Sequence, residues 1–217
     1  MIIQRSSDLS DLWRIIAAMA PRPERAVLRE RYDRRRAQVV LGAARVFARS
    51  GYDQTSVPEL ADALGMAAGA LYHYFGGKEE LLIAICDQLM EPLLVQARAL
   101  LAAGGPPAER LRALLRVWVA HVIEHRDHML VFQQERHVIE RGEQWAGVRE
   151  NRKRFERLLD GALREAREAR VTRLADDRLL LSALLGMVNH TAQWHRPRGR
   201  LSAEEIADGY AELVLKE

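Results

Sequence analysis

The chain has 217 residues, of which 48% are hydrophobic and 29% are charged, a balance that supports a buried core and excludes a wholly disordered chain. Aromatic residues make up only 6%, and the abundance of alanine and leucine favours helices over sheets. The single cysteine, Cys86, excludes an intrachain disulfide, and no cysteine–histidine set has zinc-finger spacing.

The net charge of +3 is unevenly placed. Residues 1–78 carry 12 basic and 8 acidic side chains, whereas residues 79–217 carry 21 and 22. The positive excess near the N-terminus favours a polyanionic partner there. No segment has the length and apolarity of a bilayer span and no leader is convincing, so we expect a cytoplasmic protein without a membrane partner.

Residues 1–33 do not share the helical pattern that follows. They contain one amphipathic stretch near Leu9–Met19, and we interpret them as an N-terminal extension, either a short helix with a flexible link or residues preceding the native start. From Arg34 the apolar residues recur at helical spacing as far as Phe47, and Gly51 is placed to end that helix.

A compact block of short helices comes next. Ser56 with Glu59 three residues later forms the sequence pattern of a capping box, and Gly65 ends the helix that it opens. A second short helix is predicted over Ala67–Tyr74, before Lys78 opens a longer one. Two short helices joined by a turn of three to four residues are typical of a helix-turn-helix.

The rest of the chain is predicted to be helical as well. Apolar stripes indicate helices near 108–124, 127–139, 143–169 and 179–192, and a second capping box at Ser202 opens a final helix. Because no alternating strand pattern and no repeat is found, the fold class is all-α.

Over about 45 residues without a gap, the chain resembles the DNA-binding domain of the tetracycline-repressor (TetR) family. The resemblance rests on an ordered string of motifs: Ala43-Ala44-x-x-Phe47, Gly51-Tyr52-x-x-Thr55-Ser56-Val57, Leu60-Ala61-x-x-Leu64-Gly65-Met66 and Gly69-Ala70-Leu71-Tyr72-His73-Tyr74-Phe75-x-x-Lys78-Glu79-x-Leu81. It implies a homodimeric transcriptional regulator, usually a repressor released from double-stranded operator DNA by a small ligand. The expected domains are an extension (1–33), a helix-turn-helix DNA-binding domain (34–80) and a regulatory domain for ligand binding and dimerisation (81–217).

The resemblance also places DNA contacts, and physical reasoning agrees with them. Leu71 and Phe75 are four residues apart and should face the core, which leaves Tyr72 and His73 towards the DNA backbone. Tyrosine hydroxyls, lysine ammonium groups and helix N-termini bind phosphates without reading sequence. The expected DNA-contacting residues are Arg34, Arg35, Arg36, Thr55, Ser56, Ala67, Ala68, Gly69, Tyr72, His73 and Lys78.

Ala67 and Ala68 depart from the family pattern, which often has serine and a basic or polar residue there. The recognition helix therefore lacks a side-chain N-cap and its hydrogen-bonding base readers, leaving methyl contacts with thymine or shape readout. Gly69 would allow the helix to approach the groove closely. The operator sequence does not follow from this helix.

The segment from Gly186 to Ile206 is similar to a branch of the family that senses acyl-CoA thioesters. Arg152 falls within the apolar stripe of a long helix, where a buried guanidinium needs an anion: an effector carboxylate or phosphate, or, as the alternatives, Glu135 or Glu140, or exposure to solvent. An uncharged hydrophobic effector of multidrug type is the second possibility. The expected ligand-binding residues are Trp118, His121, Phe132, Trp145, Arg152, Asn189, His190 and Trp194.

Other functions have less support in the sequence. His121, His125 and His128 have helical spacing that two or three metal ligands could use, but apart from Asp127 no cysteine or aspartate completes the set, so we expect neither metal nor cofactor. No phosphate-binding glycine loop or nucleophile elbow supports an enzyme. The rival hypotheses are a small-molecule-binding helical enzyme and a DNA-binding protein without effector. The apolar residues of the last two helices predict a homodimer through those helices.

Overall fold

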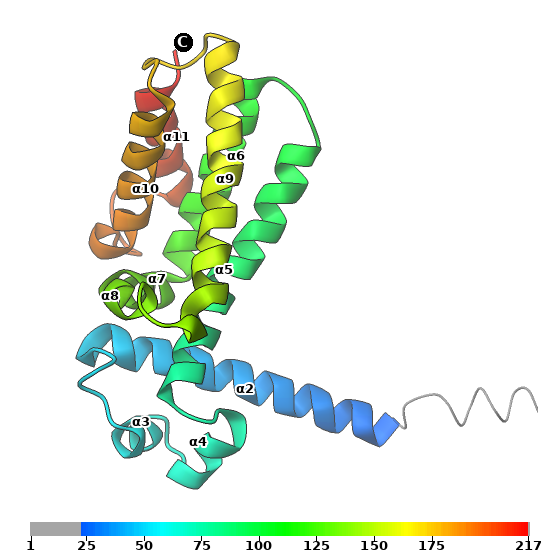
Figure 1. Ribbon diagram of the computed structural model, residues 1–217, viewed down its shortest axis with the longest axis vertical. Coiled ribbons are helices and arrows are strands. Elements are labelled where there is room, and N and C mark those ends of the chain that lie inside the picture. Colours follow the sequence, from blue (N-terminus) through cyan, green and yellow to red (C-terminus); the bar gives the residue numbers. More distant parts are fainter. Residues whose placement is uncertain (1–22, 217) are drawn as a thin grey trace, which may run out of the picture. The chain divides into compact units, whose positions relative to one another are not determined.

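The computed structural model describes residues 23–216 (Figure 1). The chain divides into two compact units, Met1–Val39 and Val40–Glu217. The amphipathic stretch at Leu9–Met19 lies outside the described residues. Within these, the secondary structure is helical apart from an isolated bridge between Thr172 and Leu215, so the all-α prediction is confirmed. None of the described helices combines the length and apolar character needed to cross a bilayer.

Helix α2 (Pro23–Ser50) begins before Arg34, where the sequence predicted its start. The physical reason is that proline suits the first turn of a helix and that residues 24–38 contain no glycine or proline to interrupt it. Arg34 on this helix forms an exposed ion pair with Glu30, at 2.7 Å between Nη2 and Oε1. The helix ends before Gly51, whose φ of +82° suits glycine, as expected.

The two short helices of the helix-turn-helix are α3 (Val57–Ala63) and α4 (Ala68–Tyr74). The capping box of α3 is confirmed, because Ser56 Oγ accepts from the Glu59 N–H and the Glu59 carboxylate accepts from the Ser56 N–H at 2.8 Å. Gly65, with a φ of +64°, follows the end of α3. Ala67 gives α4 no side-chain cap, as the sequence indicated.

The regulatory region follows as a set of long helices with short connections. Its elements are α5 (Lys78–Ala102), α6 (Pro107–Glu124), α7 (Arg126–Gln134), α8 (Arg136–Ile139), the 3₁₀ turn η1 (Glu143–Trp145), α9 (Ala146–Glu168), α10 (Asp177–Trp194) and α11 (Ala203–Val214). The single helix expected over 127–139 is therefore wrong. Its interruption lies at Glu135, whose ψ of 15° departs from α-helical geometry.

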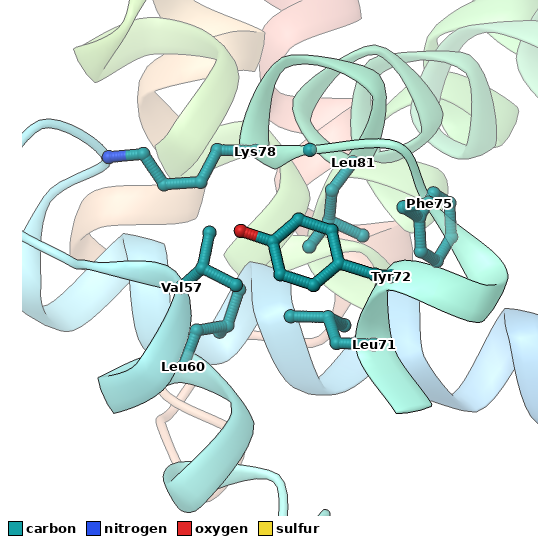
Figure 2. A pocket seen from close by; sticks show the side chains of 8 residues that line it. Val57, Leu60, Leu71, Tyr72, Phe75, Lys78 and Leu81 are labelled. Carbon is teal, nitrogen blue, oxygen red and sulfur yellow. The ribbon is translucent and has the colours of Figure 1, made fainter. Parts of the chain in front are cut away.

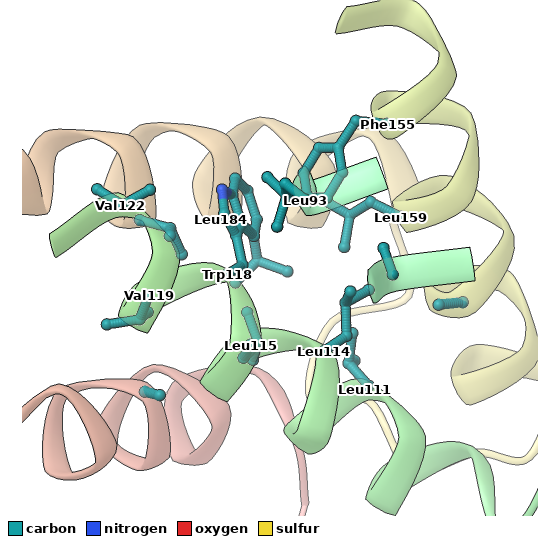
Figure 3. Close-up of a cluster of buried hydrophobic side chains, with 14 of the residues drawn as sticks. Leu93, Leu111, Leu114, Leu115, Trp118, Val119, Val122, Phe155, Leu159 and Leu184 are labelled. Atoms are coloured by element: carbon teal, nitrogen blue, oxygen red, sulfur yellow. The ribbon is translucent and has the colours of Figure 1, made fainter. Parts of the chain in front are cut away.

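The core of the regulatory region lies between α5, α6, α9, α10 and α11, which pack along one another (Figure 1). Trp118 and Phe155 meet edge to face at its centre, with ring centroids 4.8 Å apart. Figure 3 shows leucines from several of these helices around the pair, including Leu93 and Leu184. The apolar stripes predicted on α6 and α9 are buried here, which fixes the helices that form the walls of the site described next.

Candidate functional site

Helix α4 presents the two faces that its sequence predicted. Leu71 and Phe75 are buried in the core, whereas Tyr72 is 54% exposed and His73 is also exposed. The Tyr72 ring lines an apolar patch with Val57 (Figure 2). The outward face of α4 is thus made of small and aromatic residues that a flat or grooved partner can approach.

Gly69 lies on that outward face and is exposed. A Cβ built at this position would meet nothing within 4 Å, so the packing of this chain does not require glycine there. Ala67 is exposed and Ala68 is half-buried, so both methyl groups lie at the start of α4. The structure therefore leaves these three predicted DNA contacts accessible in part or in full.

Thr55 and Ser56 hold the start of α3 instead of projecting freely. Thr55 is buried, and its Oγ1 donates to the carbonyl of Gly51 at 2.7 Å. Ser56 Oγ donates to the Glu59 carboxylate at 2.7 Å, in addition to capping the helix. Both hydroxyls thus have partners within the chain, and their contact with phosphate stays a prediction.

Lys78 has a structural role that the sequence did not reveal. Its Nζ donates to the carbonyls of Tyr52 at 2.9 Å and Thr55 at 2.8 Å, and lies 4.5 Å from the centroid of the Tyr52 ring. These bonds tie the start of α5 to the loop before α3. An ammonium group has three donors, so one N–H is left for the predicted phosphate contact.

Arg34, Arg35 and Arg36 lie on α2. Arg34 and Arg35 are exposed, and Arg36 is half-buried. Arg35 Nη1 donates to Gln38 Oε1 at 3.2 Å. All three lie within α2, which begins at Pro23, and not before the first helix; their contact with DNA stays a prediction.

A cavity of about 470 Å³ lies within the regulatory region, between residues of α5, α6, α7, α8, α9 and α10. One part of its wall is apolar and includes Met90, Trp118 and Phe132, and another part is polar and charged. Its size falls within the range of small-molecule sites in proteins. Five of the predicted ligand-binding residues line it: Trp118, Phe132, Arg152, Asn189 and His190.

The other three predicted ligand-binding residues lie elsewhere. His121 is buried and bonded to the carbonyl of Leu89 through Nε2 at 2.7 Å. Trp145 is buried at η1, and Trp194 is 43% exposed at the end of α10. None of the three lines the cavity.

Arg152 reaches the cavity already paired. Its Nη1 lies 2.6 Å from Glu140 Oε1, and its buried Nε has no hydrogen-bond acceptor among the described residues, although Glu156 Oε1 lies 3.4 Å away. The hydrogen bond from Arg152 holds the pKa of the Glu140 carboxyl below its usual value. Arg136, which sequence reasoning missed, also lines the cavity and places its Nε 3.5 Å from Glu140.

The histidines of α6 and α7 bond to separate partners. His125 Nδ1 lies 3.1 Å from the carbonyl of His121, and His128 Nε2 lies 3.3 Å from Gln88 Oε1. Burial lowers the pKa of His121, and it lowers that of His128 to about 4. The His125 ring stacks on that of His121 and meets that of His128 edge to face, so the three side chains form a packed cluster whose ring nitrogens serve hydrogen bonds within the chain.

Helices α10 and α11 expose apolar and small residues. Leu179 and Leu213 are 55% and 63% exposed, and Trp194 is exposed at the far end of α10. Gly186 and Gly209, in the middle of these helices, have no atoms near a built Cβ. Small residues between larger apolar ones allow two helices to approach closely, which is typical of a helix–helix interface.

Comparison with known proteins finds matches to both the helix-turn-helix and the regulatory region. Residues 40–85 match the family described as "Bacterial regulatory proteins, tetR family", and residues 104–217 match "Tetracyclin repressor-like, C-terminal domain". The chain is 25% identical to the HTH-type transcriptional repressor KstR2 of Mycobacterium tuberculosis over 182 residues, covering 83% of this chain and 91% of the relative.

Two solved structures are similar over most of the chain. The TetR-family transcriptional regulator PfmR from Thermus thermophilus is 33% identical with a TM-score of 0.71, covering 81% of this chain and 95% of that one. AibR, solved with isovaleryl coenzyme A and operator DNA, is 31% identical with a TM-score of 0.71, covering 82% and 96%. These relatives are regulators of transcription and not enzymes.

Proposed function

The chain belongs to the tetracycline-repressor family of transcriptional regulators, and from this premise we propose that it is a repressor released from its operator by an amphipathic anion, most simply an acyl-CoA thioester. The observation that carries the proposal is the cavity of about 470 Å³, in which an apolar wall adjoins two guanidinium groups, those of Arg136 and Arg152. An acyl chain would pack against the apolar wall, and its anionic end would lie at the arginines.

The relatives support this class of ligand. AibR was solved with isovaleryl coenzyme A, which is an acyl-CoA thioester, and with operator DNA. KstR2 carries the name of a transcriptional repressor. An anion entering the cavity would replace Glu140 as the partner of Arg152, exchanging one charge-assisted hydrogen bond for another.

A second candidate effector is an uncharged hydrophobic compound. The ion pair between Arg152 and Glu140 favours it, because the guanidinium already has an anionic partner and needs none from a ligand. The apolar wall would then supply most of the binding free energy. In the first candidate the arginines bind the effector, whereas in the second Arg152 stays paired with Glu140.

The experiment compares release of the protein from the DNA upstream of its own gene by a panel of acyl-CoA thioesters and by uncharged hydrophobic compounds. We expect release by at least one thioester at micromolar concentration. A ligand shifts this equilibrium only by its differential affinity for the two states. Release by an uncharged compound alone would replace the anion proposal with the second candidate.

Two substitutions of the same ion pair sharpen the test. Arg152→Met should weaken binding of the thioester about tenfold or more, because a charge-assisted hydrogen bond is lost. Glu140→Gln should leave binding unchanged or strengthen it, because the competing carboxylate is gone. The affinity for an uncharged effector should change equally in both variants. Changes in affinity of opposite sign therefore indicate an anionic effector.

On the DNA side, we propose that the outward face of α4 enters the major groove, with Ala67, Ala68 and Gly69 near the bases and Tyr72 and His73 at the backbone. The exposure of this face supports the assignment. Arg34, Arg35 and Arg36 remain proposed contacts to phosphate or the minor groove. Dimerisation through α10 and α11 would present two such helices to one operator.

A further inference from the structure

Three side chains with metal-binding atoms meet away from both the cavity and the outward face of α4. Asp53 lies in the segment between α2 and α3, Glu135 lies at the interruption between α7 and α8, and His137 lies on α8. One ligand atom from each lies within 4.8 Å of those of the other two. We refer to these residues as the 53/135/137 cluster.

The orientation of His137 points to a cation. Its Nδ1 lies 3.3 Å from the carbonyl oxygen of Gln134, which can only accept, so Nδ1 carries the proton and donates. In the neutral ring Nε2 is then an acceptor, and it faces Asp53 Oδ2 at 3.9 Å. A metal ion, or a second proton on the ring, would join these two exposed groups. A backbone carbonyl that holds the other ring nitrogen is the usual support of a metal-ligating histidine.

Glu135 supplies the buried side of the cluster. Its side chain is only 6% exposed, and its Oε1 accepts from the backbone N–H of Tyr52 at 3.2 Å. That bond fixes one carboxylate oxygen close to the segment that carries Asp53. Two carboxyl groups and an imidazole offer oxygen and nitrogen ligand atoms around one point, a set that suits a divalent transition-metal cation.

We propose that the 53/135/137 cluster binds one divalent transition-metal ion of the Zn²⁺ class, with water completing the coordination. Zinc accepts both carboxylate oxygen and imidazole nitrogen at roughly 2.0–2.2 Å, so the exposed Asp53 and His137 side chains would move towards Glu135 to close around it. Mg²⁺ and Ca²⁺ prefer oxygen ligands alone, and the imidazole selects against them.

Binding would join two functional parts of the chain. Asp53 precedes α3 of the helix-turn-helix, whereas Glu135 and His137 flank Arg136, which lines the effector cavity. The metal would therefore couple the helix-turn-helix to the cavity wall, and metal and effector would alter each other's affinity by the same factor. This coupling rests on the proposed function, whereas the metal site itself does not.

The test of the site is a calorimetric titration of the full-length protein, without a histidine tag, with ZnCl₂. We expect one ion per chain, and we expect Asp53→Asn and His137→Gln each to weaken binding about tenfold or more. Both side chains are exposed, so the variants should fold. Glu143→Gln and His195→Gln, which change one carboxylate and one histidine outside the cluster, serve as matched controls and should bind zinc like the unmodified protein.

Three results would overturn the site: no stoichiometric zinc binding, equal affinity in His137→Gln, or equal affinity for Mg²⁺. Stabilisation by acid alone, without any response to zinc, would show that a proton on His137 is the missing charge. The coupling is tested by operator affinity with and without zinc. Zinc binding without any change in operator affinity would retain the site and refute the coupling, and neither titration depends on the identity of the effector.

Discussion

Tyr72 and Lys78 line the same apolar patch beside α3, but their polar ends are engaged differently (Figure 2). The Lys78 ammonium is bound to two backbone carbonyls, whereas the Tyr72 side chain is 54% exposed on the outward face of α4. A substitution at Tyr72 therefore reports on DNA, and a substitution at Lys78 reports on both DNA and folding.

Tyr72→Phe is expected to weaken binding to operator and to unrelated DNA alike by about tenfold or more, because one hydrogen bond to a charged phosphate is lost. Sequence preference should not change, since phosphate contacts carry no base information. Fluorescence anisotropy on both DNAs measures the loss, and the unfolding midpoint should stay the same. A selective loss at one base pair would show that the hydroxyl reads a base.

Lys78→Met provides the contrast at the other end of the patch. It should lower the free energy of unfolding by about 1–3 kcal/mol, because the carbonyls of Tyr52 and Thr55 lose their charged donor. If the remaining N–H also contacts phosphate, the salt dependence of DNA binding should fall by about one unit of slope. Thermal unfolding and a salt titration separate the two effects.

His128 makes stability depend on pH in one direction. Burial lowers its pKa in the folded chain from 6.5 to about 4. Between these two pH values the His128 side chain is therefore protonated in the unfolded chain but not in the folded chain. Stability from this residue is complete above pH 6.5 and is lost as the pH falls towards 4, with a limiting slope of about 1.4 kcal/mol per pH unit for one proton. Chemical denaturation at several pH values should show that the free energy of unfolding of His128→Gln depends less steeply on pH between 4 and 6.5. An unchanged slope would locate the titration elsewhere.

At the scale of elements, the signals that the sequence could reveal were local. The capping boxes at Ser56 and Ser202 lie within four residues and appear in the structure as predicted. The interruption at Glu135 did not follow from the sequence, because the Glu135 carboxylate accepts a hydrogen bond from the backbone N–H of Tyr52, which lies 83 residues earlier in the chain. Periodicity placed Trp118 inside the regulatory region, but it could not separate cavity-lining aromatics from Trp145, which is buried at η1.

The same local chemistry predicts how to stabilise α4. Ala67 has the extended backbone of an N-cap, with φ −68° and ψ 145°, but no side-chain acceptor. Ala67→Ser should raise the free energy of unfolding by about 0.5–1 kcal/mol, whereas Ser56→Ala should lower it by about 1 kcal/mol through loss of the capping box of α3. Thermal denaturation measures both. If both variants changed the free energy of unfolding by the same amount and in the same direction, the side-chain caps of α3 and α4 would not determine the stability of these helices.

At the scale of the whole molecule, the exposed apolar residues of α10 and α11 need a partner. Leu179 and Leu213 lie on helices whose opposite faces are buried in the core, so their exposure cannot be removed by rearranging one chain. A second copy that presents the same two helices would cover them in a two-fold interface of four helices. Gly209, four residues before Leu213 on α11, would allow the backbones to approach.

Leu179→Glu combined with Leu213→Glu is therefore expected to weaken the dimer about a hundredfold or more, because each carboxylate would be buried without a partner. Val95→Glu is the matched control, since Val95 is 65% exposed on α5, away from both helices. Sedimentation velocity at micromolar concentration should give dimers for the control and monomers for the double variant. Since a dimer presents two recognition helices to successive major grooves, the monomeric variant should also lose operator affinity while each chain keeps its helical content. A double variant that remains dimeric would place the interface on other helices, and a stable monomer of the unmodified chain would refute dimerisation itself.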